Sequence, residues 1–194
     1  MAATTVTIHQ QALMVAQEHG VHAVTIESLA KITGIAKTTI YRRWPSAATI
    51  VMDAFLEEVG SAISYEYTGD IVATFKASTQ AFVNRLSELD GDLLRQLVGE
   101  AQRSPVLLHA FMTRWINPRR AMGFEVIAKA IEAGELRVGL DSDAILDAIY
   151  GAIYYALLIP VQQSISSDRI NFIIEAMFSS HLAAKVDVVS GAPS

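Results

Sequence analysis

Cysteine is absent from the sequence, so a disulfide framework, a thiolate metal site and a cysteine nucleophile are all excluded. The opening residues, Met1 to Gln11, lack the charged and apolar segments of a secretory leader. The strict alternation of apolar and polar residues that is typical of strands is missing too. These absences favour a helical protein of the cytoplasm.

Signs of enzymatic chemistry are also missing. The sequence has no nucleophile elbow, no phosphate-binding glycine loop and no carboxylate pair that helical periodicity would bring together. The histidines show no spacing that suits a metal; they are His9, His19, His22, His109 and His181. We therefore expect no enzyme activity, no metal and no cofactor.

Charge is unevenly distributed along the chain. The formal net charge is −5, yet residues 1–50 carry an excess of two positive charges, which leaves −7 on the remainder. The four bases of this region lie close together; they are Lys31, Lys37, Arg42 and Arg43. A small basic module on an acidic body is typical of a nucleic-acid-binding protein.

Apolar periodicity and capping residues predict an all-α fold of about nine helices. An N-terminal three-helix module over residues 1–50 is expected, with a fourth, connecting helix over 46–67 and a larger helical body over 51–185. Residues 186–194 are predicted to be a disordered tail. The body helices are predicted over 70–89, 92–102, from 105 to a break or kink at 117–118, over 119–133, 144–161 and 167–185.

The segment from Gly34 to Ser46 predicts a helix-turn-helix. A glycine that tolerates positive φ is followed by Ile35 and by a helix that restarts two residues later. Ile35 and Ile40 are expected to face inward, which leaves the hydroxyls and cations between Lys37 and Arg43 on the outer face. Such side chains suit a helix that lies in a major groove.

In its order and spacing, the stretch from Ile8 to Ser46 resembles the DNA-binding module of the TetR/AcrR repressors. The matching features are Gly20, Thr25 with Leu29-Ala30, Gly34-Ile35, Thr39-Ile40-Tyr41 and Trp44. The resemblance implies DNA contacts by Thr25, Lys37, Thr38, Thr39, Tyr41, Arg42 and Arg43. Three departures predict weaker affinity for DNA: Ala36 cannot cap the recognition helix, Ala47 stands where many members have Lys, and no basic arm precedes the module.

The resemblance also implies a body that binds a small effector and forms a homodimer through its last two helices. The apolar run over 144–161 is long enough to span a membrane, but its tyrosines, its Asp147 and its lack of a basic flank favour burial on two sides. The predicted interface comprises Ile149, Ile153, Leu157, Phe172, Ile173, Met177 and Phe178. The predicted effector pocket comprises Phe82, Leu86, Leu97, Phe111, Trp115, Met122, Phe124, Tyr150 and Tyr154.

The sequence thus predicts a ligand-responsive transcriptional regulator, a repressor that binds a palindromic double-stranded DNA operator as a dimer. A small, largely apolar effector in the body would release the operator. The alternative is a helical module that binds a small molecule or a protein and has weakened DNA binding, because Ala36 and Ala47 remove two favourable contacts.

Overall fold

The computed structural model describes residues 3–60, 64–87, 91–159 and 165–183. Within these ranges the chain is helical and has no strand, apart from one isolated bridge between Leu136 and Leu182. The all-α prediction is therefore confirmed. The α-helices are α1 (Ala3–His19), α2 (Ile26–Thr33), α3 (Lys37–Tyr41), α4 (Ala47–Gly60), α5 (Ile71–Arg85), α6 (Gly91–Ala101), α7 (Pro105–Phe111), α8 (Asn117–Glu132), α9 (Ser142–Leu158) and α10 (Ser167–Ser179).

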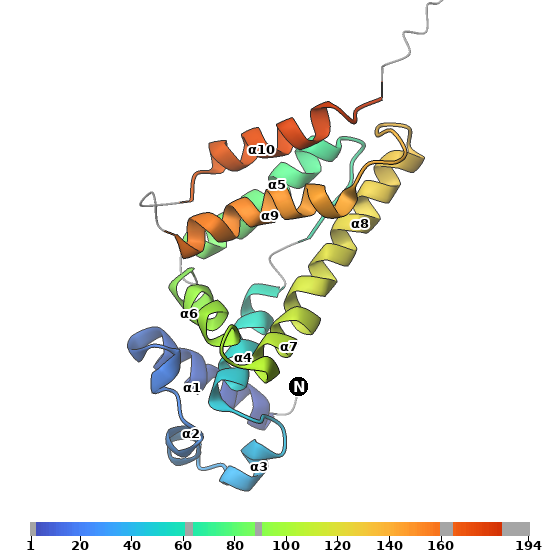
Figure 1. Ribbon diagram of the computed structural model, residues 1–194. Helices are drawn as coiled ribbons and strands as arrows, with labels where there is room; N and C mark the ends of the chain where they lie inside the picture. The colour runs from blue at the N-terminus through green and yellow to red at the C-terminus, as the bar shows by residue number, and fades with distance from the viewer. Residues whose placement is uncertain (1–2, 61–63, 88–90, 160–164, 184–194) are drawn as a thin grey trace, which may run out of the picture.

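Helix α4 connects the two parts of the molecule (Figure 1). On one side it packs against α1, and on the other it contacts α6 and α7. Its apolar side chains Ile50, Val51 and Phe55 are almost completely buried, so one continuous core runs from the small helices at one end into the long helices of the body. The predicted domain boundary at residue 50 falls within this helix and stays a prediction.

The connecting helix is shorter than the predicted 46–67. It ends at Gly60, and residues 64–67 are not helical. The reason is tertiary: Glu135, after α8, accepts hydrogen bonds from the Tyr67 hydroxyl and the Ile71 backbone amide, both at 2.8 Å. These bonds hold the segment before α5 in a non-helical conformation.

The chain does not break at Asn117-Pro118, where a break or a kink was predicted. The chain stays helical from α7 into α8 because the π-helical segment Met112–Ile116 joins them, and Pro118 lies in the first turn of α8. A proline ring clashes with the carbonyl four residues earlier in a regular α-helix. A wider π turn just before Pro118 relieves that clash without ending the helix.

The last two helices also differ from their predicted ranges. Asp141 caps α9 by accepting a hydrogen bond from the Ala144 amide at 3.0 Å. Helix α10 ends at Ser179, not at residue 185, and the chain turns back so that Leu182 lies beside Leu136. The predicted tail, 186–194, and the end of the apolar run, 160–161, lie outside the described residues. No helix in the described ranges is both long and apolar enough to cross a membrane.

Candidate DNA-binding surface and effector cavity

Two short helices and a glycine turn build the predicted helix-turn-helix. Thr25 caps α2: its hydroxyl accepts a hydrogen bond from the Ser28 amide, and the Ser28 hydroxyl accepts one from the Thr25 amide. Gly34 ends α2 with φ of 71°, a left-handed conformation that favours glycine. Ile40, on the inner face of α3, is fully buried, and Ile35 of the turn is partly buried. The turn therefore has the predicted form.

The outer face of α3 is polar and open. Lys37, Thr38, Tyr41 and Arg42 are exposed, and Thr39 is half-buried. Tyr41 exposes 52% of its surface, which leaves its hydroxyl free to reach a ligand outside the module. As predicted, Ala36 provides no side-chain cap for α3.

Two cations of this surface already have polar partners within the chain. The Lys37 ammonium lies 3.0 Å from a Glu27 carboxylate oxygen, which lowers the pKa of that carboxyl. The Arg43 guanidinium donates a hydrogen bond to the Thr5 hydroxyl of α1. Thr25, which was predicted to contact DNA, uses its hydroxyl as the cap of α2. Arg42 has no ion-pair or hydrogen-bond partner for its side chain in the described part of the chain, so it is the cation that stays available.

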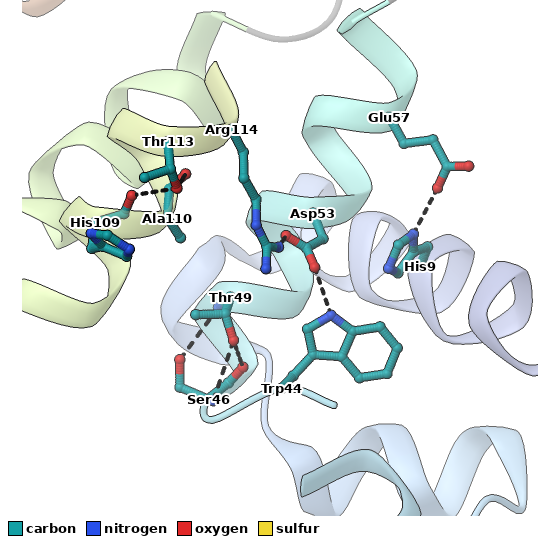
Figure 2. A network of polar contacts seen from close by, with 10 residues as sticks. All are labelled: His9, Trp44, Ser46, Thr49, Asp53, Glu57, His109, Ala110, Thr113 and Arg114. Carbon is teal, nitrogen blue, oxygen red and sulfur yellow. Dashed lines mark hydrogen bonds and ion pairs between the residues drawn. The ribbon is translucent and has the colours of Figure 1, made fainter. Parts of the chain in front are cut away.

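A polar bridge joins this module to the body (Figure 2). Asp53 of α4 accepts a hydrogen bond from the Trp44 indole nitrogen at 2.8 Å, and its other carboxylate oxygen pairs with Arg114 of the π-helical segment. Trp44 is buried and packs edge-on against the ring of His9. One carboxylate thus links the residue that follows the recognition helix to the helix that continues into the body.

Next to this bridge, the body contains a cavity of about 380 Å³. Four residues that were predicted for the pocket line it: Phe82, Trp115, Tyr150 and Tyr154. The other five do not: Leu86, Leu97 and Phe111 are buried in the core, and Met122 and Phe124 are half-buried on α8 away from this lining. The prediction identified the aromatic residues but missed the charged ones, which are Arg119, Arg120 and Asp147.

The polar groups of the cavity are arranged around Arg119. Its guanidinium carbon lies 3.2 Å from the centre of the Trp115 ring, and its Nη1 donates to the Trp115 carbonyl oxygen at 3.3 Å. The Trp115 indole nitrogen donates to the Tyr154 hydroxyl at 2.8 Å. Burial lowers the pKa of Arg119 to about 10 and raises that of Tyr154 to about 12. At neutral pH the arginine is therefore charged and the phenol keeps its proton.

The predicted dimer residues fall into two groups. Ile149, Ile153, Leu157 and Phe178 are buried inside the single chain, so the expectation that they face a partner is wrong. Their apolar side chains are needed to pack α9 and α10 onto the body. Phe172 is 70% exposed, and Ile173 and Met177 are half-buried. Other exposed apolar residues, which the prediction did not name, are Tyr155, Leu158 and Ile159 of α9 and its end.

Comparison with known proteins supports both parts of this description. Residues 8–51 match the family described as "Bacterial regulatory proteins, tetR family", and residues 66–176 match "Tetracyclin repressor-like, C-terminal domain". The HTH-type transcriptional regulator YdeS of Bacillus subtilis is 33% identical over 142 residues, which cover 73% of this chain and 72% of YdeS.

Solved structures show the same fold. The TetR family transcription regulator SCO0332 superposes with a TM-score of 0.78 at 26% identity, over 91% of this chain and 97% of its own. The Flavonoid-responsive Regulator FrrA gives a TM-score of 0.66 at 17% identity, over 93% of this chain and 95% of its own. At that identity, the second likeness concerns the fold alone.

The Asp53 bridge should contribute measurably to stability. Asp53→Ala leaves the buried Trp44 N–H without an acceptor, so we expect the free energy of unfolding to fall by about 1–3 kcal/mol in chemical denaturation. The matched control is Asp92→Ala, because the Asp92 side chain is 84% exposed and its pair with Arg95 lies on the surface. That change should cost less than about 1 kcal/mol. Equal losses in the two variants would show that the bridge adds nothing.

Proposed function

Because the chain belongs to the TetR family of DNA-binding transcriptional regulators, we propose that it is a ligand-responsive repressor that binds a palindromic operator as a homodimer. The observation that carries this proposal is the outer face of α3. Thr38, Tyr41 and Arg42 are exposed on a helix anchored from beneath by the fully buried Ile40. Hydroxyls and a forked cation on a rigid helix are what base edges and phosphates require.

The cavity supplies the second half of the proposal. Its volume of about 380 Å³ and its aromatic lining suit a small organic effector. FrrA, which has this fold, is named as responsive to flavonoids. We propose that this chain also responds to a small molecule, without assigning it the same ligand. Binding in the body has to alter the recognition helices for such a response to occur.

The Asp53 bridge is the route that we propose for this coupling. Trp115 lines the cavity, and its neighbour Arg114 in the same π-helical segment pairs with Asp53. Asp53 in turn holds Trp44, which lies after the two turn residues that follow the recognition helix (Figure 2). An effector that displaces Trp115 would move Arg114 and so change the position of α4 and of the module. The differential affinity required is modest, about 1–3 kcal/mol.

DNA binding can be tested with single substitutions on α3. Arg42→Ala and Tyr41→Ala should each weaken binding to an operator selected by the protein from random duplex DNA, by about 10-fold or more in gel-shift titrations. The control Arg103→Ala removes the same charge from an exposed position of the body, where the side chain pairs only with Glu100. Unchanged affinity in both α3 variants would refute the DNA-binding surface.

The coupling route can be tested without knowing the effector, because coupling between two sites is reciprocal. Operator binding should slow hydrogen–deuterium exchange in the π-helical segment Met112–Ile116 of the wild-type protein. In Arg114→Ala, whose side chain is 55% exposed, this response should be lost while operator affinity is retained. The control Arg103→Ala should respond like the wild type. A full response in Arg114→Ala would place the coupling elsewhere.

We propose that the dimer forms through the outer faces of α9 and α10. Phe172 has the largest exposed aromatic surface of this region, and Tyr155, Leu158 and Ile159 add apolar surface on α9. Two copies paired in this way would place two recognition helices on one duplex. The two-fold axis of the dimer would then coincide with that of a palindromic operator, whose half-sites lie about 34 Å, one helical turn, apart.

Phe172→Glu tests this interface. A central aromatic anchor contributes about 2 kcal/mol or more, so the dissociation constant of the dimer should rise about 30-fold or more in sedimentation equilibrium. The monomer should stay folded because Phe172 is outside the core. Met14→Glu, at a position of α1 that is 59% exposed, is the control and should leave the dimer intact. A Phe172→Glu protein that dimerises like the wild type would exclude this face.

A further inference from the structure

The two arginines that line the effector cavity differ in their ionic partners. Of its two arginines, Arg120 pairs with both Asp143 and Asp147. Asp147 also lines the cavity, and its negative charge is already paired with Arg120. Arg119 has no carboxylate partner among the described residues. The two carboxylates near the cavity both pair with Arg120, and Arg119 has no counterion in direct contact among the described residues.

Arg119 is held in place but incompletely satisfied. Its position is fixed by the Trp115 ring at 3.2 Å and by the hydrogen bond to the Trp115 carbonyl oxygen. Its Nε atom, however, is buried without a hydrogen-bond partner in the described part of the structure. A half-buried guanidinium without a counterion is costly, because burial removes water from the charge. An anion bound in the cavity would offset that cost.

Of the two tyrosine hydroxyls in the wall, that of Tyr154 offers a donor. The Tyr154 hydroxyl oxygen accepts from Trp115, so its own hydrogen is available to an acceptor in the cavity. The Tyr150 hydroxyl shares a hydrogen bond with Tyr65, and burial raises the pKa of both phenols, so neither becomes an anion at neutral pH. The Arg119 Nε–H and the Tyr154 hydroxyl are thus donors without an acceptor among the described residues, and they favour a ligand that brings acceptor oxygens.

The aromatic wall could by itself suit a quaternary ammonium, which binds to the faces of aromatic rings. Here the face of Trp115 is already covered by Arg119, whose positive charge repels a cation. The rings of Phe82 and Trp115, whose centroids lie 5.9 Å apart at an interplanar angle of 55°, make this part of the cavity wall apolar. Charge and shape together point away from a cation and towards an aromatic anion.

We infer that the effector is an aromatic or otherwise apolar molecule that carries one carboxylate, sulfonate or similar anionic group, and that Arg119 binds this group. The inference rests on the proposed function, since it concerns the ligand of the same cavity. Tyr154 donates a second hydrogen bond to the anion, and the rings of Trp115 and Phe82 contact the apolar body. Arg119 thus determines which class of molecule the cavity accepts.

A matched pair of fluorescent probes tests the inference. 1-Anilinonaphthalene-8-sulfonate and N-phenyl-1-naphthylamine share one aromatic skeleton, and only the first carries an anion. The quantity compared is the ratio of the affinity for the sulfonate to the affinity for the neutral probe. This ratio should be at least 10-fold higher in the wild-type protein than in Arg119→Gln. Arg119→Lys should keep part of the preference because it keeps the charge but not the planar fork. The control Arg103→Gln, with the same change of net charge, should keep all of it.

Three further outcomes decide the matter. Ile116→Trp, which places a larger ring in the cavity, should weaken both probes; a probe that still binds lies outside the cavity and counts against the inference. Equal preference for the sulfonate in wild type and Arg119→Gln overturns it. Operator binding of each variant is measured separately. A protein that binds no operator but keeps the Arg119-dependent preference contradicts the proposed function alone.

Discussion

The relative orientation of the DNA-binding module and the body depends on a single carboxylate on the helix where they meet. Asp53 lies on α4, which packs on the small module with one side and on the body with the other. Its two oxygens serve one partner on each side, the Trp44 indole and the Arg114 guanidinium. A hydrophobic contact at this place would hold the parts together without defining their relative orientation. A carboxylate with two directional partners defines it.

The cavity lies one residue away from this bridge along the chain. Arg114 and Trp115 are consecutive in a π-helical segment, so one points to α4 while the other lines the cavity. The wide turn lies just before Pro118, where a proline ring would disfavour a regular helix. Local backbone chemistry thus places the ligand site and the link to the module on the same piece of chain.

Much of the module was predictable because its signals are local. The cap at Thr25, the left-handed Gly34 and the buried Ile40 are each recognised within a few residues of sequence. The Asp53 bridge was not predictable, because Trp44, Asp53 and Arg114 are brought together only by the packing of α4 against α7 and the π-helical segment. Arg119 was missed for the same reason, since an arginine near a proline gives no sign of which ring it will cover.

The prediction for α9 shows where helical patterns are ambiguous. A helix that is apolar on almost every side was expected to divide its large residues between the body and a partner. The structure instead directs Ile149, Ile153 and Leu157 to the core, and leaves Tyr155 and Leu158 on the outside. Periodicity identified the helix correctly, but it could not show which side of a uniformly apolar helix the body covers.

The ion pair between Lys37 and Glu27 has a consequence for how the module approaches a duplex. Because Lys37 is paired with Glu27, the two side chains together bring no net charge to a phosphate. Long-range attraction is left to Arg42, Arg43 and Lys31, on a chain whose total charge is negative. Fewer condensed counterions are then expelled when the complex forms, and its strength varies less with ionic strength than the number of bases suggests. Binding by such a module depends on its fit to the groove more than on the release of counterions.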